Sequence, residues 1–256
     1  MLRSMYAGVS GMKGFQTKLD VIGNNISNVN TIGYKKSTIN FQDLLSQNMS
    51  GGGANPMQVG LGSSAGAINV NHNAGSSMTT GVGTDLTIMG DGFFIVQEPG
   101  TDNEYLTRAG NFTVTSEGNL VTAQGYQVLD DAGEPIDLSD FASFSIGRTG
   151  EITGKNLAGE DLDAINIGVF APTNPGGLTK FGGSLYQMTE GAGGEIAYNT
   201  AGDSNSQIAS GMLEMSNVDL TEEFTEMIIA QRGFQANSRT ITTSDEILQE
   251  VVNLKR

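Results

Sequence analysis

The stretch SNVDLTEEFTEMIIAQRGFQANSRTITTSDEILQEVVNLKR, residues 216–256, has the residue spacing of one long helix. Apolar side chains recur in it at every seventh position, which places them in a single stripe along a helix. The stripe consists of Leu220, Met227, Phe234, Ile241 and Leu248. Ser216 and Asp219 are suitable N-cap residues, and acidic residues follow where the helix dipole favours them. At about 1.5 Å per residue the helix is roughly 55 Å long, so we expect a rod that projects from its domain.

A second line of this helix, three and four positions further along, is mixed. Phe224, Ala230, Val251 and Val252 are apolar, whereas Asn237, Ser238, Ser244 and Asp245 are polar. A dry two-stranded coiled coil prefers two apolar lines. Two interpretations therefore remain. The helix either packs on its own domain, or it is shared between neighbouring subunits, with one face buried in the contact and the other face in water.

The first thirty residues show the same seven-residue spacing, in Met5, Met12, Leu19 and Ile26. Four glycines interrupt this helix, and each costs up to about 1 kcal/mol relative to alanine in a helix interior; they are Gly8, Gly11, Gly14 and Gly23. Small residues also permit close approach of a second helix. We expect a helix that is marginal alone and that assembly stabilises.

Between the two helices the pattern changes to short apolar runs separated by turns. Residues 93–96 and 165–170 are typical of strands, and Asp91-Gly92 and Glu117-Gly118 are typical of turns. The sequence predicts an α+β fold, in which residues 1–33 and 216–256 pair into a helical rod. Residues 71–189 form an all-β body of short antiparallel strands. Residues 34–70 and 190–215 are the predicted connecting segments.

Composition excludes several classes of partner. The chain has 13 Lys and Arg against 28 Asp and Glu, a net charge of −15, so we expect no nucleic-acid partner and no binding to an anionic membrane. No apolar run is long enough for membrane insertion, and the N-terminus lacks the pattern of a cleavable signal peptide. We therefore expect a chain that is cytosolic or exported without such a signal.

Residues that could act in catalysis or bind a metal ion are scarce. The chain has no cysteine, and His72 is its only histidine. A catalytic triad or a zinc site of the usual cysteine and histidine type therefore cannot be assembled. The acidic clusters at residues 130–131 and 160–163 lack the ligand spacing of a calcium loop. We predict no catalytic residue, no metal site and no cofactor.

Residues 24–36, NNISNVNTIGYKK, resemble the N-terminal motif of bacterial flagellar rod and hook proteins, with Asn24, Asn25, Asn28 and Gly33 in the motif. Residues 90–94 and 105–112 resemble the β-domain motifs of this family. Residues 216–220 and 230–232 resemble its C-terminal helix. The resemblance covers nearly the whole chain.

The resemblance implies an axial polymer in which terminal helices form the inner tube and a β domain forms the outer layer. It also implies export of the unfolded chain through the flagellar type III apparatus, and a place in the extracellular flagellum. The nine stripe residues of the two helices are the expected contacts between copies. Residues 217–220 and 241–256 resemble hook proteins more than distal rod proteins.

We therefore expect a hook subunit, with the distal rod protein as the alternative because only one β domain fits this length. A hook subunit implies several partners: further copies of itself, the distal rod protein, the hook–filament junction protein, the hook cap and the export apparatus. An enzyme and a secreted adhesin are the other classes considered. An enzyme requires a pocket with ionisable groups of perturbed pKa. An adhesin does not require heptads at both ends.

Overall fold

The structure is a computed structural model that describes residues 2–50, 57–101, 103–156, 159–160, 162–202 and 206–254. In chain order the elements are α1 (Leu2–Ser27), β1 (Ser37–Asp43), β2 (Ser46–Ser50), β3 (Met57–Gly60), β4 (Ser63–Val70), β5 (Ser77–Thr79), β6 (Leu86–Met89), β7 (Phe93–Gln97), β8 (Glu104–Thr107), β9 (Thr113–Val114), β10 (Leu120–Val121), β11 (Gln127–Val128), β12 (Ser143–Ile146), β13 (Glu151–Lys155), β14 (Ile165–Asn166), β15 (Val169–Phe170), η1 (Pro175–Gly177), β16 (Thr179–Gly182), β17 (Leu185–Gln187), η2 (Glu190–Ala192), β18 (Gln207–Ser210), β19 (Met212–Glu214) and α2 (Leu220–Leu254), where η marks a 3-10 helix. The prediction of an α+β fold with helices at both ends is confirmed.

The chain divides into two compact units, which we describe separately. The helical unit contains Met1–Ser27, Ser37–Asn71 and Val218–Arg256. The β unit contains Asn28–Lys36 and His72–Asn217. The segment that follows α1 therefore belongs to the β unit, although the strands after it return to the helical unit.

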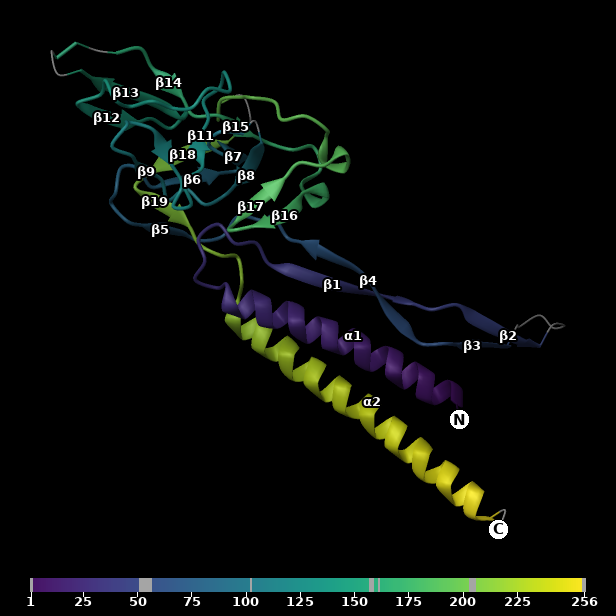
Figure 1. The fold of residues 1–256 in the computed structure, drawn as a ribbon. Helices are drawn as coiled ribbons and strands as arrows, with labels where there is room; N and C mark the ends of the chain where they lie inside the picture. The colour runs from purple at the N-terminus through teal and green to yellow at the C-terminus, as the bar shows by residue number, and fades with distance from the viewer. Residues whose placement is uncertain are drawn as a thin grey trace. The chain divides into compact units, whose positions relative to one another are not determined.

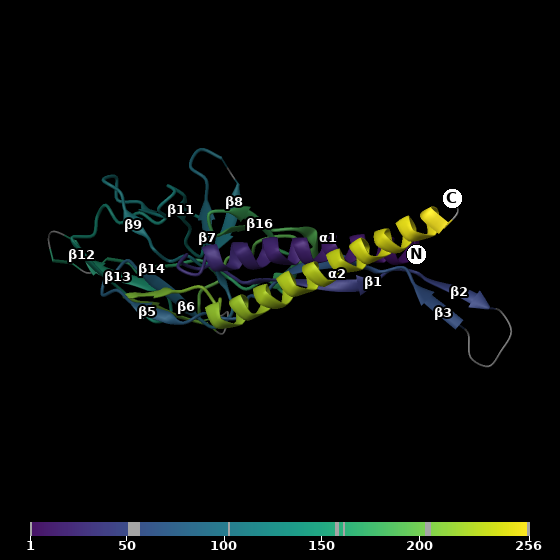
Figure 2. The ribbon, with the colours of Figure 1, turned by 90° about the horizontal axis from the view of Figure 1, so that it is seen from below.

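In the helical unit, α1 and α2 lie side by side and run in opposite directions (Figures 1 and 2). Helix α2 begins at Leu220 because Asp219 caps it: a carboxylate oxygen of Asp219 accepts the backbone N–H groups of Thr221 at 2.8 Å and Glu222 at 3.4 Å. Ser216, the other suggested cap, lies before the helix, which starts four residues later than the predicted stretch.

The helical unit also contains a two-stranded ribbon. Strand β1 pairs antiparallel with β4 from Ser37↔Val70 to Asp43↔Ser63, with a bulge between Asn40 and Phe41. Strands β2 and β3 pair in the same antiparallel sense. Phe41 lies over α1, with its ring centroid 6.2 Å from that of Phe15. Residues 51–56 of the predicted connecting segment 34–70 lie outside the described residues.

The β unit is built around one eight-stranded antiparallel sheet in the order β16-β17-β8-β7-β11-β10-β9, with β15 also paired to β7. Strands β12, β13 and β14 form a second sheet, and two further pairs are β18 with β6 and β19 with β5. Strand β7 is buried on both faces, which explains its uninterrupted apolar run. Phe93 and Ile95 enter one core, and Phe94 and Val96 enter the other.

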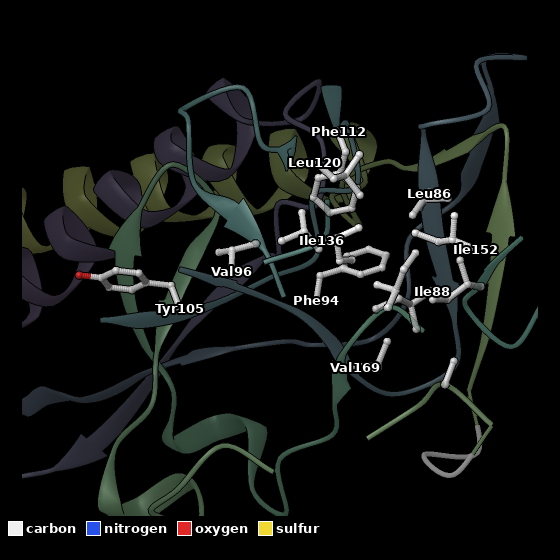
Figure 3. Packing of buried hydrophobic residues seen from close by; sticks show 14 of the residues in the cluster. Leu86, Ile88, Phe94, Val96, Tyr105, Phe112, Leu120, Ile136, Ile152 and Val169 are labelled. Atoms are coloured by element: carbon white, nitrogen blue, oxygen red, sulfur yellow. The ribbon is translucent and has the colours of Figure 1, made fainter. Parts of the chain in front are cut away.

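The larger of these cores contains the aromatic pair Phe94 and Phe112, whose ring centroids are 5.1 Å apart in an edge-to-face arrangement. Figure 3 labels ten of its residues: Leu86, Ile88, Phe94, Val96, Tyr105, Phe112, Leu120, Ile136, Ile152 and Val169. These side chains come from strands and loops spread over the whole β unit, so this unit has a core of its own.

Candidate assembly surface

Helices α1 and α2 approach closely because small residues lie where they meet. A Cβ added at Gly8 would lie 3.2 Å from Cγ1 of Ile241, and one at Gly233 would lie 2.5 Å from the ring of Phe15. A side chain at Gly233 would therefore push the helices apart or displace the Phe15 ring. These glycines weaken each helix alone but permit the close contact between them.

Polar side chains are buried along the same contact. Asn25 is 1% exposed and Glu223 is 2% exposed. The amide nitrogen of Asn25 donates to the Ser37 carbonyl at 2.9 Å and to Glu223 at 3.2 Å, and its amide oxygen accepts the Ser37 N–H at 3.0 Å. Asn25, one of the motif residues, thus connects the end of α1 to the start of both β1 and α2.

Of the predicted stripe residues, Ile241 lies against Gly8 in this contact, whereas two others are exposed. Leu220 is 39% exposed and Phe234 is 37% exposed. The others are half-buried: Met5, Met12, Leu19, Ile26, Met227, Ile241 and Leu248. Their role as contacts between copies stays a prediction.

The more deeply buried line of α2 also has a seven-residue spacing and consists of Glu223, Ala230, Asn237 and Ser244. Asn237 is half-buried and the other three are buried. Asn237 and Ser244 were placed, from the sequence, among the polar residues that interrupt an apolar line. That prediction assumed that helices contact each other through apolar side chains. The spacing of small and polar residues was the signal that could have revealed this line.

Much apolar surface of the helical unit is left uncovered. Among its described residues, Ile22 and Ala230 are the only fully buried hydrophobic side chains. Helix α2 alone exposes Phe224, Ile228, Ile229, Ile247, Val251, Val252 and Leu254. Exposed apolar surface of this extent is typical of a protein interaction site.

Two further motif residues, Asn28 and Gly33, belong to the β unit. The amide oxygen of Asn28 accepts the Thr31 hydroxyl at 3.1 Å, which stabilises the turn after α1. Gly33 has a φ of +67°, and its N–H donates to the Glu214 carbonyl at 2.9 Å. A Cβ at Gly33 would lie 2.6 Å from the backbone nitrogen of Ala109. Both the backbone conformation and the space therefore require glycine here. Asn24 is exposed on α1.

A buried ion cluster anchors this turn. One carboxylate oxygen of Glu214 lies 2.5 Å from Nζ of Lys35 and accepts the Gly75 N–H at 2.9 Å, and the other lies 3.2 Å from the Arg108 guanidinium. The side chains of all three ionised residues are at most 2% exposed. Burial lowers the pKa of Lys35, and the neighbouring Glu214 carboxylate opposes this shift. The cluster fixes the chain both after α1 and before α2.

His72 lies beside this cluster, with its ring in edge-to-face contact with two aromatic rings. Its ring centroid is 5.7 Å from that of Phe93 and 5.5 Å from that of Tyr186. Burial lowers the pKa of His72 to about 4, and the positive charges of Lys35, Arg108 and Lys180 act in the same direction, while the Pro175 backbone opposes them. The imidazole is therefore neutral at pH 7 and packs as an aromatic ring against Phe93 and Tyr186.

No group of three or more His, Cys, Asp or Glu side chains among the described residues is placed to hold a metal ion. None of the helices, within the described ranges, combines the length and apolar character needed to cross a membrane.

Paired terminal helices with uncovered apolar faces, and a β unit between them in the sequence, agree with the axial subunit that the resemblance implies. Three family models match the chain: "Flagella basal body rod protein" at residues 5–35, "Flagellar hook protein FlgE/F/G D1 domain" at residues 87–154, and "Flagellar basal body rod FlgEFG protein C-terminal" at residues 209–254. The chain belongs to the flagellar rod and hook protein family.

Among its relatives, the chain is 52% identical to the flagellar basal-body rod protein FlgG of Bacillus subtilis, over 100% of both chains. It is 36% identical to the FlgG of Borreliella burgdorferi, again over 100% of both chains. The flagellar hook protein FlgE of Borreliella burgdorferi is 28% identical, in an alignment of 447 residues. Since this chain has 256 residues, much of that hook protein has no counterpart in it.

The expectation of a hook subunit is therefore wrong. The relatives with higher identity over the whole chain are rod proteins. The misleading segments, residues 217–220 and 241–256, belong largely to the C-terminal helix, whose family model covers FlgE, FlgF and FlgG together. A helix that hook and rod proteins share cannot discriminate between them. The length of the chain, which leaves room for only one β domain, was the better indication of a rod protein.

Proposed function

We propose that this chain is the distal rod subunit of the flagellar basal body and that it polymerises with further copies of itself into a hollow axial segment. The observation that carries the proposal is the 52% identity to a rod protein FlgG over the full length of both chains. The uncovered apolar faces of the helical unit support self-assembly, because burying them removes apolar surface from water.

We propose the following arrangement in the polymer. Residues 1–33 and 216–256 form its core, residues 34–70 and 190–215 connect the layers, and residues 71–189 form the outer domain. The nine stripe residues, including Met12 and Ile241, make contacts between copies. Their partial exposure supports this role, because the intramolecular helix contact covers only part of each side chain.

A structural role without catalysis fits the β unit. One pocket of about 540 Å³ is lined mostly by amide, hydroxyl and glycine residues, with Tyr34, Lys180 and Tyr186 as its ionisable groups. Burial lowers the pKa of Lys180 and raises the pKa of Tyr186. The lining residues of this pocket include neither a carboxylate nor a histidine that could exchange protons with these groups.

The proposed partners are further copies of this chain and the flagellar type III export apparatus. The rod of the basal body is the proposed location, in place of the external hook. The hook–filament junction protein and the hook cap were expected because of the hook assignment, and they are not part of this proposal.

Deletion of the gene in its own bacterium tests the proposal. Purified basal bodies imaged by electron microscopy should show a truncated rod without a hook, and the parent gene on a plasmid should restore the full rod. A complete rod that lacks only its external curved segment would contradict the assignment.

A further inference from the structure

We propose that copies of this chain join head to tail through two separate apolar patches of α2. The tip patch consists of Ile247, Val251 and Leu254, which are 48%, 51% and 86% exposed. The base patch consists of Leu220, Phe224 and Ile228, which are 39%, 50% and 52% exposed. The tip patch of one copy docks on the base patch of the next. This inference rests on the proposed self-assembly and identifies the surfaces that meet.

The register of the two helices leaves the end of α2 without a partner from α1. Gly8 lies against Ile241, Gly11 against Asn237, and Phe15 against Gly233. Continuing this antiparallel register places the first residue of α1 opposite residue 247. The remaining residues, 248–254, extend about 10 Å past α1 at 1.5 Å per residue. Figure 1 shows the end of α2 beyond the start of α1.

The two patches face different sides of α2. Successive residues are rotated by about 100° around a helix with 3.6 residues per turn, so the centres of the two patches are roughly 145° apart. A single straight partner helix cannot cover both patches at once. Each patch therefore requires a separate neighbour.

The surface between the patches is mostly polar. Gln231, Arg232, Gln235, Arg239 and Thr242 are exposed along the middle of α2, where Phe234 is an exception at 37% exposure. Two α2 helices packed side by side in the same direction and register would bring equal charges together, for example at Arg232. The two ends of α2 are therefore its best apolar docking surfaces.

Equivalent subunits in a helical polymer must use different surfaces on the two sides of each contact. A tip-to-tip or base-to-base contact is two-fold symmetric and closes a pair. A contact between tip and base, by contrast, can repeat identically from copy to copy. The two uncovered ends of α2 meet this requirement, so the occupant of each patch is the other patch on a second copy.

Site-specific cross-linking tests the contact, because the chain has no cysteine of its own. One variant carries Phe224→Cys and the other carries Val251→Cys. Each variant is assembled alone, and the two are also assembled as an equimolar mixture. After oxidation, the products are separated by non-reducing electrophoresis and identified by mass spectrometry. We expect a dimer linked from position 224 to position 251 in the mixture alone. Gln235→Cys, in the exposed polar middle, replaces either cysteine as the matched control and should give no such product.

Three other outcomes would overturn the contact. Dimers in either separate population would show that like patches meet. Polymers of the mixture, or of the parent, without the 224–251 product would exclude this contact while leaving self-assembly in place. A parent chain that forms no polymer under any condition that supports rod assembly in cells would overturn self-assembly itself, and this contact with it.

A charge placed in one patch gives a second measurement. Val251→Asp should raise the concentration needed for polymerisation by about tenfold or more, because the docked carboxylate loses its water. Thr242→Asp, at an exposed position on a different face from the tip patch, should change it little. Equal polymerisation of Val251→Asp and the parent would exclude the tip patch.

Discussion

The side-chain amide of Asn25 donates to the carboxylate of Glu223 at 3.2 Å, with both residues almost fully buried where α1 and α2 meet. This contact joins residues 198 positions apart in the chain. Since the same amide also binds Ser37 through two hydrogen bonds, one side chain holds three segments of the helical unit together. A motif residue that the sequence associates with a family therefore has a direct physical role.

Replacing this amide by a carboxylate tests that role. Asn25→Asp is nearly isosteric but places two carboxylates together and removes the N–H donor. We expect a loss of about 1–3 kcal/mol per subunit, which raises the concentration needed for polymerisation by about tenfold or more. Sedimentation of polymer against subunit concentration measures it. Asn24→Asp, at the exposed neighbouring position, should have a much smaller effect.

The buried cluster around Glu214 leads to a prediction for the β unit. Glu214→Gln keeps the shape of the side chain but leaves Lys35 and Arg108 without a buried counter-charge. We expect the free energy of unfolding to fall by about 3–5 kcal/mol, as measured by urea denaturation followed by near-ultraviolet circular dichroism. Glu151→Gln on the exposed face of β13 is the control. A similar loss in both variants would show that the cluster has no special role.

Replacing glycine by alanine should have opposite effects on polymerisation at Gly233 and at Gly23. A Cβ at Gly233 would lie 2.5 Å from the Phe15 ring, whereas one at Gly23 would meet no described atom within 4 Å. Gly233→Ala should weaken polymerisation by separating α1 and α2. Gly23→Ala should strengthen it, because alanine favours a helix interior by up to about 1 kcal/mol. Polymerisation that improves in both variants would show that helix propensity outweighs close packing.

Much of this fold could be predicted from the sequence, because its local signals agree with the final structure. The run from Phe93 to Val96 predicted a buried strand, and the seven-residue spacing predicted both helices. The start of α2 was placed too early because Ser216 and Asn217 lie in a segment without regular secondary structure. The amide oxygen of Asn217 accepts the Lys36 N–H at 2.7 Å, a contact that no local pattern reveals.

The candidate surface was harder to predict for two physical reasons. Buried residues of α2 such as Glu223 and Ser244 are polar, so a prediction based on apolar stripes missed them. The pair of Lys35 and Glu214 spans 179 positions, and neither residue's neighbours in sequence indicate the other. Long-range pairing of charges follows from the fold and cannot be read from spacing.

The single histidine gives a direct spectroscopic prediction. Burial beside three cations lowers the pKa of His72 to about 4, so its only imidazole C–H signals in a proton NMR spectrum should titrate near pH 4. Between pH 6.5 and 4 the unfolded chain binds a proton that the folded chain does not, so stability falls as pH falls through this window. The upper bound of this effect is about 3–4 kcal/mol, and solvent screening of the partly exposed residue makes it smaller.

His72→Phe provides the control, since it keeps an aromatic ring between Phe93 and Tyr186. This variant should lose the part of the acid destabilisation that lies between pH 6.5 and 4. A His72 signal that titrates near pH 6.5 in the folded protein would contradict the buried placement of the ring.

The two units should differ in stability in the free subunit. Fully buried hydrophobic side chains lie almost entirely in the β unit, whereas the described part of the helical unit contributes Ile22 and Ala230. Helices in water rarely persist without packing, and a two-stranded ribbon alone is marginal. We expect the ends of the free subunit to be largely disordered and to become helical on polymerisation, while the β unit stays folded.

Hydrogen exchange followed by mass spectrometry measures this difference in both states of the same chain. Peptides from residues 5–26 and 220–254 should exchange within seconds in the monomer and become protected in the polymer. Peptides that contain β7 should be protected in both states, because Phe94, Ile95 and Val96 are fully buried within the β unit itself. The comparison requires a sample shown to be monomeric by sedimentation. Strong protection of residues 5–26 in such a sample would show that α1 and α2 hold each other without neighbours.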